Sequence, residues 1–356
     1  MSISQLLENI KIGYGYDNII FTQRLLQDVK QKQPYRGLRI LHNVPLYKNT
    51  LLKIEPLVVG GGIVTVTSPN FSSYDQEAVD LLESCQVSVE LDHSKIKDDY
   101  DFVLDAGGEF KELITPRIGA AELTKSGEKI YSDPKITYPV INVDNSQLKQ
   151  LETKLGTGDG LVRGLTFYLN DDFHGKAFVL FGYGKVGSGA ALALKQYTSD
   201  ITIVECDQDR ILEAKEDGFD VLVNNDKQAI EKVLSNCYGV ITATGKKGLI
   251  TDYYSPELFK HKVLSNLGID DEYGSAFTND EVLNNKQAIN FRLDDPTEIK
   301  YMDPIFYAHN IVIDLILSGD FTPGLHPFPE DLDKSILQEW MGYFAKESGI
   351  TLTRAD

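Results

Sequence analysis

Short hydrophobic runs of strand length recur along the chain and alternate with longer segments of helical spacing. In the first part of the sequence the runs are RGLRIL, GGIVTVT, CQVSVEL, YDFVLDAGG and YPVINV, at residues 36–41, 61–67, 85–91, 100–108 and 138–143. Apolar runs of this length, bounded by turn residues, are typical of parallel strands that are buried on both faces. The pattern predicts an α/β domain built on a parallel sheet.

A second series of such runs begins near residue 176. It comprises KAFVLF, DITIVE, FDVLV, YGVITATG, HKVLSNLG and KQAINF, which are separated by helical stretches. Six strands is the number in a doubly wound dinucleotide-binding fold. The chain is therefore predicted to be an α/β protein with two Rossmann-like doubly wound domains.

The domain boundaries follow from two segments. Residues 145–172 contain two helical segments around the glycine-rich stretch GTGDG, which predicts a turn and a hinge between domains. From residue 302, MDPIFYAHNIVIDLILSGD predicts a long apolar helix before the proline-rich loop TPGLHPFPED, and we expect this helix to return to the first domain. Residues 1–150 plus 302–356 would then form a substrate-type domain, and residues 151–301 would be a dinucleotide-binding domain inserted into it.

The most specific motif is FVLFGYGKVGSG, at residues 178–189. Its glycines have the spacing that suits a tight turn from strand to helix and lets a pyrophosphate approach the backbone. The amides of the turn would face the phosphates at a helix N-terminus, where the helix dipole favours an anion. The predicted contacts are Gly182, Gly184, Lys185, Val186 and Gly187.

An acidic residue follows at the distance that this motif requires. Glu205 ends the next strand, 18 residues after Gly187, close to the roughly 20 expected for the acid that binds the ribose. A carboxylate there accepts hydrogen bonds from the 2′-hydroxyl and repels a 2′-phosphate, so the motif favours NAD over NADP. The alternative is an α/β domain in which the glycine turn and Glu205 are only structural.

Residues at the ends of later strands complete the predicted cofactor site, because ligands of open α/β sheets lie at the carboxyl ends of the strands. We expect Asn266 to orient the carboxamide of the nicotinamide. The floor beneath the ring would be formed by Thr242, Thr244, Gly245 and Gly268.

Composition excludes several other classes of function. The formal net charge of −18 argues against nucleic acid and anionic membranes as partners, since both require a basic face. The beginning of the chain lacks the basic end and apolar core of a secretory signal, which predicts a cytoplasmic setting. The three cysteines are too scattered for a zinc site, so no metal is expected.

Several motifs together resemble one enzyme family. The segments INVDNSQLK, LGTGDGLVRGL, FGYGKVGSG, VECD, ITATG and SNLG follow, in order, the cofactor half of the S-adenosyl-L-homocysteine hydrolases. In the first domain LHNVPL, SPNFSSYD and VLDAGGEF are similar to family motifs as well. The resemblance covers most of residues 36–310.

This resemblance implies a cycle in which tightly held NAD oxidises a ribosyl 3′-hydroxyl, homocysteine is expelled, water adds, and the hydride returns. Lys149 falls on the family's lysine beside the 3′-hydroxyl, and His42 on a histidine that handles protons at the leaving group. Asp105 remains the first acid of a DDGG-like motif. ELTKSG leaves Thr124 and Ser126 able to bond NAD.

Other family positions are changed. The second acid of the DDGG motif is Ala106, although Glu109 follows in place of another acid. The remaining replacements are Leu123 for a glutamate that faces the substrate, Thr153 and Lys154 for an Asp and an Asn, and Ile269 and Asp303 for histidines. The terminal segment ITLTRAD also lacks the family's lysine and tyrosine, which reach the NAD of a neighbouring subunit.

The three candidate catalytic residues each have a structural alternative. Lys149 could be a lysine on a surface helix, His42 could pack at a strand end and bond a backbone carbonyl, and Asp105 could cap the next element.

Three functional hypotheses remain open. The first is an NAD-dependent enzyme that oxidises a hydroxyl of a small, nucleoside-like substrate through Lys149. The second is a genuine S-adenosylhomocysteine hydrolase with rearranged proton carriers, and the third is a non-catalytic NAD-bound sensor or scaffold. A homodimer or another homo-oligomer is expected in each case.

Overall fold

The computed structural model describes residues 2–97, 99–170 and 172–348, and the chain forms two compact units. The first unit combines Met1–Lys149 with Met302–Asp356, and the second is Gln150–Tyr301. The terminal segment ITLTRAD, residues 350–356, lies outside the described residues. Among the described residues, no helix is long and apolar enough to cross a membrane.

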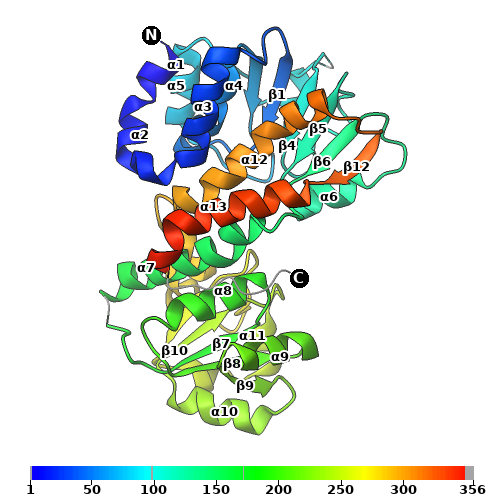
Figure 1. Cartoon of the computed structure of the whole chain (residues 1–356). Helices are drawn as coiled ribbons and strands as arrows, with labels where there is room; N and C mark the ends of the chain where they lie inside the picture. The colour runs from blue at the N-terminus through cyan, green and yellow to red at the C-terminus, as the bar shows by residue number, and fades with distance from the viewer. Residues whose placement is uncertain (1, 98, 171, 349–356) are drawn as a thin grey trace. The chain divides into compact units, whose positions relative to one another are not determined.

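The first unit is built around a seven-stranded sheet, labelled in Figure 1. Its strands are β1 (Arg39–Asn43), β2 (Ile63–Thr67), β3 (Ser88–Val89), β4 (Phe102–Asp105), β5 (Gly119–Glu122), β6 (Pro139–Asn142) and β12 (Gly324–Pro327). Its helices are α1 (Ile3–Leu6), α2 (Glu8–Tyr14), α3 (Ile20–Lys32), α4 (Lys48–Val59), α5 (Gln76–Ser84), α6 (Lys125–Tyr131), α12 (Ile299–Ser318, beginning in the second unit) and α13 (Glu330–Ser348), with short 3₁₀ turns η1 (Tyr16–Asn18) and η2 (His93–Lys95).

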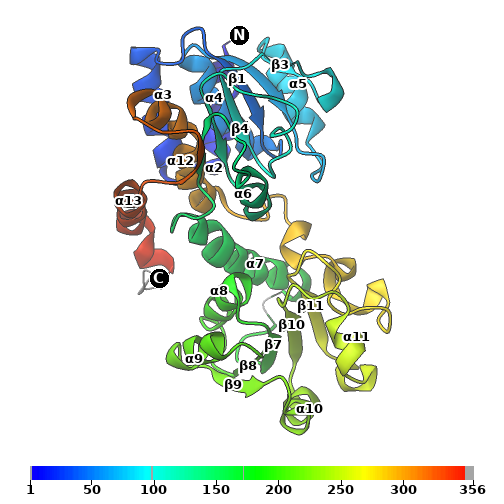
Figure 2. The same cartoon turned by 90° about the vertical axis from the view of Figure 1, so that its right-hand side faces the viewer.

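All neighbouring strands of this sheet are parallel, in the order β12-β6-β5-β4-β1-β2-β3. Because side chains alternate along a strand, each strand supplies both faces. Leu41 and Val103 pack with Tyr131 of α6 on one face. On the other face, a side chain at Gly119 would meet Ile316 of α12. Helices thus cover both faces, and Figure 2 shows the same unit from the side.

The second unit has a five-stranded parallel sheet in the order β11-β10-β7-β8-β9. Its strands are β7 (Phe178–Phe181), β8 (Ile201–Glu205), β9 (Asp220–Val223), β10 (Gly239–Thr242) and β11 (Val263–Asn266). Its helical segments are η3 (Leu151–Gly156), α7 (Thr157–Leu169), α8 (Lys185–Leu194), α9 (Gln208–Glu216), α10 (Lys227–Asn236), α11 (Leu249–Tyr253), η4 (Pro256–Phe259), η5 (Asn279–Glu281), η6 (Leu283–Lys286) and η7 (Ile289–Arg292).

Alternation along the central strand of this sheet produces two cores. Phe178 and Leu180 of β7 belong to the core under α7 and α8, whereas Val179 and Phe181 belong to the core under α10 and α11. The prediction of an α/β protein with two Rossmann-like domains is confirmed.

The strand predictions were wrong at three places. KQAINF is not a sixth strand: it lies in η6 and η7, and the positive φ angles of Asn284, Asn285 and Lys286 interrupt any extended path. The structure adds β5 at Gly119–Glu122, which the pattern of hydrophobic runs did not reveal, and β12 at Gly324–Pro327, inside the predicted proline-rich loop. The sequence pattern did not predict these two strands, because β5 consists largely of small residues and prolines lie in and beside β12.

The glycine-rich stretch GTGDG is helical, so the predicted turn is also wrong. It runs from the π-helical turn η3 directly into α7. Its glycines serve close packing: a Cβ at Gly158 would lie 2.3 Å from the carbonyl oxygen of Gly189 in α8, and one at Gly160 would lie 2.6 Å from that of Pro296. Such contacts leave no room for a side chain, so glycine is required here for contact and not for turning.

Asp303 joins two distant helices of the first unit. It lies on α12, and its carboxylate accepts hydrogen bonds from the amides of Phe21 (2.7 Å) and Thr22 (3.0 Å) and from the Thr22 hydroxyl (2.5 Å). These donors lie in the first turn of α3, where amides have no partner within the helix. Asp303, at the position of a family histidine, therefore acts as a helix cap supplied from outside the helix.

We expect Asp303→Ala to lower the free energy of unfolding by about 2 kcal/mol or more, since it leaves buried amides without an acceptor. Asp226→Ala is the matched control, because Asp226 caps α10 at an exposed position through the Ala229 amide, and its loss should cost about 1 kcal/mol or less. Urea unfolding measures both. Equal effects of the two substitutions would contradict the role assigned to Asp303.

Candidate functional site

The glycine loop after β7 has the geometry that a dinucleotide requires. Gly182 has a φ of +94°, and a Cβ at Gly187 would lie 2.1 Å from the Gly182 carbonyl oxygen. Gly184 is the N-cap of α8, and no side chain caps the amides of the first turn, which includes Lys185 and Val186. A helix N-terminus with uncapped amides favours a phosphate.

Glu205 lies at the end of β8 and contacts this loop. Its carboxylate accepts hydrogen bonds from the amides of Tyr183 (2.6 Å), Cys206 (2.6 Å) and Asp207 (3.1 Å). Burial raises the pKa of Glu205, but these three hydrogen bonds outweigh burial, so the pKa is lowered overall. Glu205 is therefore ionised at neutral pH and suited to accept a hydrogen bond from a ribose hydroxyl.

The loop after β10 is held by a glutamate that sequence reasoning missed. Glu272 is fully buried and accepts hydrogen bonds from the amides of Thr244 (2.9 Å) and Gly245 (2.7 Å) and from the Thr244 hydroxyl (2.7 Å). A Cβ at Gly268 would lie 2.2 Å from its carboxylate. Glu272 thus holds Thr244, Gly245 and Gly268 together, and their role as the floor of the site stays a prediction.

Asn266 is more constrained than predicted. Its amide nitrogen donates to the carbonyls of Gly268, Asp270 and Lys286, and its oxygen accepts from the Thr242 hydroxyl and the Gly268 amide. The nitrogen and the oxygen of the Asn266 side chain both form hydrogen bonds inside the protein. Asn266 and Thr242 therefore fix the ends of β11 and β10. This arrangement leaves Asn266 no donor for a carboxamide.

In the first unit, the carboxyl ends of five adjacent strands carry one continuous row of polar residues. Thr67 is in register with Asn43, and Glu122 with both Asp105 and Asn142. Asn43 donates to Asp105 at 2.7 Å, which joins the two halves of the row. All five side chains are fully buried. In-register residues of a parallel sheet point to the same face, here the face covered by α6.

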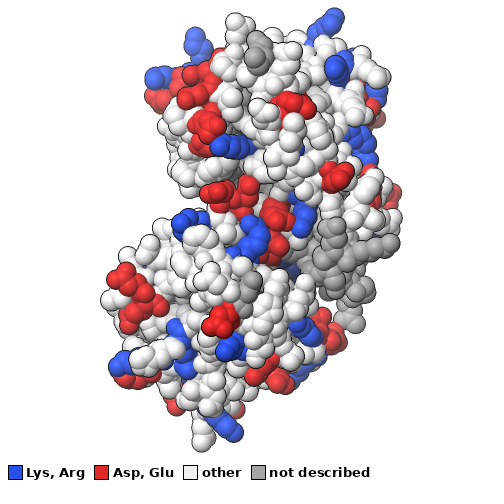
Figure 3. Space-filling model, turned by 90° about the vertical axis from the view of Figure 1, so that its left-hand side faces the viewer, with Lys and Arg blue, Asp and Glu red and all other residues white. Residues whose placement is uncertain are grey.

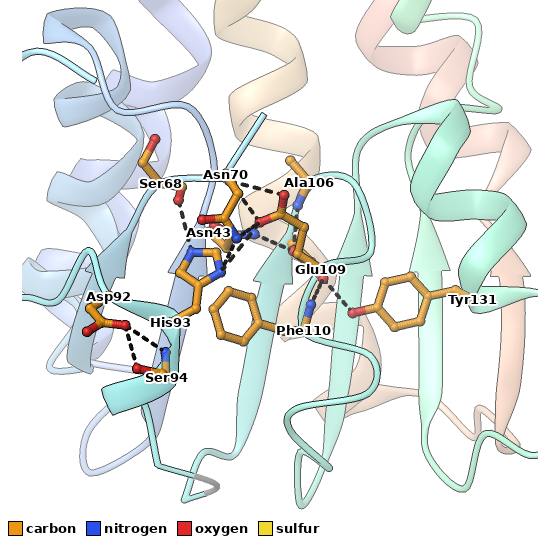
Figure 4. A network of polar contacts seen from close by, with 11 residues as sticks. Asn43, Ser68, Asn70, Asp92, His93, Ser94, Ala106, Glu109, Phe110 and Tyr131 are labelled. Carbon is orange, nitrogen blue, oxygen red and sulfur yellow. Dashed lines mark hydrogen bonds and ion pairs between the residues drawn. The ribbon is translucent and has the colours of Figure 1, made fainter. Parts of the chain in front are cut away.

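Asp105 and Glu122 are the two acids of this row. Asp105 accepts from the amides of Ala106 and Phe110 and from the hydroxyl of Tyr131, contacts drawn in Figure 4. Glu122 accepts from the amides of Gly107 and Gly108 at 3.1 and 3.0 Å. Burial and then the charge of Asp105 raise the pKa of Glu122 to about 7, and burial raises that of Asp105.

Glu109 lies in a second group of contacts in Figure 4. Its carboxylate accepts the amide of Asn70 at 3.0 Å and lies 3.5 Å from His93. The ring of His93 also contacts the Ser68 carbonyl at 3.0 Å and the ring of Phe110. Glu109 therefore fixes the loop after β2 together with His93, which the sequence reasoning did not single out.

His42 points to the opposite face of the sheet, because it is paired with Leu104 and precedes Asn43. Its Nε2 lies 3.1 Å from Nζ of Lys53 on α4, and that nitrogen also donates to Asn310 of α12 at 2.9 Å. His309, next to Asn310, is fully buried. Burial, and then the charges of Lys53 and His309, lower the pKa of His42 well below its ordinary value. His42 and Asp105 therefore lie on different faces.

Lys149 follows β6 and is 8% exposed. The turn that carries it is held by Asp333 of α13, which accepts the amides of Gln147 (2.6 Å) and Leu148 (3.0 Å). The charge of Lys149 helps to lower the pKa of His309, after burial and Lys53. Lys149 thus lies within electrostatic reach of His309, and the same holds for Lys53 and His42 on the opposite face of the sheet from Asp105.

The remaining predicted residues lie at α6 and in the second unit. Thr124 is the N-cap of α6, where it receives the Gly127 amide and contacts the hydroxyl of Ser126 at 3.1 Å. Lys154 lies 3.5 Å from Glu213, and Ile269 is 94% exposed. Ala106 and Leu123, at positions of family acids, are both buried.

Comparisons with known proteins agree with this geometry. Residues 153–295 match the family described as "S-adenosyl-L-homocysteine hydrolase, NAD binding domain". The S-inosyl-L-homocysteine hydrolase of Methanopyrus kandleri is 24% identical over 380 residues, covering 92% of this chain and 88% of that protein.

The chain is similar to the S-adenosyl-L-homocysteine hydrolases and is a divergent relative of them. An adenosylhomocysteinase of Sulfolobus acidocaldarius is 28% identical over 67% of this chain, but this match spans only 61% of that enzyme. A solved structure of a transhydrogenase from Sinorhizobium meliloti aligns over 78% of this chain and 93% of its own, with a TM-score of 0.43 and 12% identity. The cofactor of this protein is NAD.

The residues that sequence reasoning missed share one property. Lys53, Glu272, His309 and Asp333 lie in helices or loops without a motif of their own. A lysine within the apolar helix LLKIEPL was the one visible signal, since buried lysines are rare. Their partners come from segments far away in the sequence.

We expect Gly187→Ala to weaken NAD binding by roughly tenfold or more, because a Cβ 2.1 Å from the Gly182 carbonyl displaces the loop from the α8 amides. The measurement is the NAD content of the purified protein together with calorimetric titration. Gly13→Ala is the control, as nothing lies within 4 Å of a Cβ there. Unchanged NAD binding by Gly187→Ala would exclude the loop as the phosphate site.

The pKa of Glu122 predicts a pH dependence of stability. Between pH 4.5 and about 7 the native state holds a proton that the unfolded chain releases, so the free energy of unfolding falls as pH rises through this window. Glu122→Gln should remove this part of the slope, at most about 1.4 kcal/mol per pH unit. Urea unfolding from pH 5 to 8 tests it, with exposed Glu83→Gln as the control. A slope unchanged by Glu122→Gln would show that Glu122 is ionised throughout.

Proposed function

We propose that this protein uses bound NAD to oxidise a hydroxyl group of a small, nucleoside-like substrate, with Lys149 as the base. One observation carries the proposal: Lys149 follows a turn that the Asp333 carboxylate fixes through two backbone amides, and its charge acts on His309, which lies near Lys53 and His42. A base and a proton carrier on one side of a sheet edge are the groups that alcohol oxidation requires of the protein. NAD supplies the hydride acceptor.

The protonation state of His42 supports this division of roles. Because burial and neighbouring positive charge lower its pKa, the ring is neutral at physiological pH and able to accept a proton. Its Nδ1 has no hydrogen-bond partner among the described residues. Lys149 would take the proton of the substrate hydroxyl, and His42 would move a proton at a second position of the same substrate.

The second candidate is hydrolysis of a homocysteine nucleoside, and the long match to an S-inosyl-L-homocysteine hydrolase favours it. That reaction would need a proton carrier in place of the acids that the family resemblance implies at Ala106 and Leu123. Glu109 and Asp105 are engaged with backbone amides and with Asn70 or Tyr131. His42 is therefore the residue on which hydrolysis would depend.

The proposal predicts that Lys149→Met lowers the rate of NAD reduction by about 10²-fold or more, because an apolar side chain cannot take the proton. NAD-loaded protein is incubated with adenosine, inosine, S-adenosylhomocysteine and S-inosylhomocysteine. The absorbance of reduced nicotinamide and the released products are followed. Exposed Lys135→Met is the matched control, and partial rescue of Lys149→Met by added methylamine would assign the loss to the missing amine.

The outcomes separate the three hypotheses. Reduced nicotinamide that accumulates supports oxidation, whereas release of homocysteine with no net change in the cofactor supports hydrolysis. NAD that stays oxidised with every ligand, while the protein binds one of them, would support a sensor and sink the catalytic proposal.

A further inference from the structure

Lys53 is fully buried and has no acidic partner among the described residues. Its Nζ contacts two neutral groups, Nε2 of His42 at 3.1 Å and Oδ1 of Asn310 at 2.9 Å. Asn310 also donates to the backbone carbonyl of Lys53 at 2.7 Å, which fixes the side chain from both ends. Burial lowers the pKa of Lys53 well below its ordinary value. A lysine held in this way is rare in a structural core.

The acidic side chains on the elements around Lys53 have other partners. Glu55, also on α4, pairs with Lys11 at 2.6 Å. On α12, Asp303 caps α3, and Asp314 accepts the hydroxyl of Tyr35 at 2.9 Å. On the strands, Asp105 and Glu122 belong to the row on the opposite face. Among the described residues, the polar side chains near Lys53 are therefore neutral or basic: His42 and Asn310 in contact with it, and His309 within electrostatic reach.

Other side chains on this side also have unused polar groups. Neither ring nitrogen of His309 has a hydrogen bond of normal geometry, and Nδ1 of His42 has none either, within the described residues. Burial and the positive charges of Lys53 and Lys149 lower the pKa of His309, an effect that the Ala121 carbonyl opposes. Ala106 and Leu123, the buried residues at family acid positions, add no negative charge.

A cation buried without a counter-ion is strongly disfavoured, so proteins pair such groups or use them to bind a ligand. Here three nitrogen-bearing side chains from β1, α4 and α12 converge, and no carboxylate among the described residues of the unit compensates them. We propose that Lys53, His42 and His309 form the binding site for an anionic group, a carboxylate or a phosphate, on the small molecule that this protein binds. That this molecule is a substrate rests on the proposed function, but the binding of an anion at this site does not.

Binding an anion here should be coupled to proton uptake. Without the ligand, burial favours the neutral amine of Lys53, and an anion beside it restores the charged form. One proton then enters with each anion, and the affinity for the anion falls as pH rises. Because the three side chains are fully buried, the anion enters only during local opening, so association should be slower than the usual range for an open site.

The test uses the full-length, NAD-loaded protein and two probes, malonate and inorganic phosphate. Calorimetric titration in two buffers of different ionisation enthalpy measures the affinity and the number of protons taken up. We expect Lys53→Met to weaken binding of the preferred probe by roughly tenfold or more and to abolish proton uptake. His309→Phe should also weaken binding. The probe that binds better distinguishes a carboxylate from a phosphate.

A matched pair of buried lysines gives the control. Lys53→Met removes a buried amine without an acidic partner but leaves Oδ1 of Asn310 without its donor, so it should lower thermal stability only modestly. Lys11→Met leaves the Glu55 carboxylate buried and unpaired and should lower thermal stability more. Lys11→Met should keep anion binding. The inference is overturned if neither probe binds the wild type, if Lys53→Met binds as the wild type does, or if Lys53→Met fails to fold.

The same samples separate this inference from the proposed function. Anion binding that depends on Lys53 in a protein that never reduces its NAD would leave the anion site standing and refute the oxidation. NAD reduction on uncharged nucleosides by a protein that binds neither malonate nor phosphate would support the oxidation and refute the anion site.

Discussion

The first unit depends on the hydrogen bonds of one buried row of polar side chains. Five adjacent strands end at the same level in Thr67, Asn43, Asp105, Glu122 and Asn142, all removed from water. Buried polar groups need partners inside the protein, although Oδ1 of Asn43, Oγ1 of Thr67 and Nδ2 of Asn142 have none among the described residues. Asp105 and Glu122 find theirs in the amides of the loops after β4 and β5, so these loops are fixed in place. The opposite side of the same edge carries His42, for which we propose a catalytic role.

Carboxylates that bind backbone amides recur in both units. Asp303 caps α3, Asp333 holds the turn before Lys149, Glu205 holds the glycine loop, and Glu272 holds the loop after β10. In each case a side chain from one segment anchors another that is distant in sequence or lies across a strand end. Part of the strongly acidic composition thus has a structural use. On the face shown in Figure 3, acidic side chains are interspersed with lysine and arginine at the surface.

The balance of charge on the His42 side differs from what the family resemblance implies. Acids are expected at Ala106 and Leu123, and the chain has apolar residues there, while Lys53 and His309 add basic groups nearby. Lys149 keeps its place. Apolar residues at these two positions, beside the buried nitrogen atoms of Lys53 and His309, fit the proposed ligand with negative charge.

The sequence by itself determined what depends on local pattern. Buried parallel strands are apolar throughout, and the glycine loop is a contiguous motif, so the fold class, the loop at Gly182–Gly187 and the acid at Glu205 could be predicted. The strand at Gly119–Glu122 and the helix at GTGDG could not be predicted. Small residues and glycines indicate turns until their packing partners are known. Only the tertiary structure paired Lys53 with His42 and Asn310, and Asp333 with the turn before Lys149. Those contacts join residues up to 257 positions apart, and no local pattern encodes a partner at that distance.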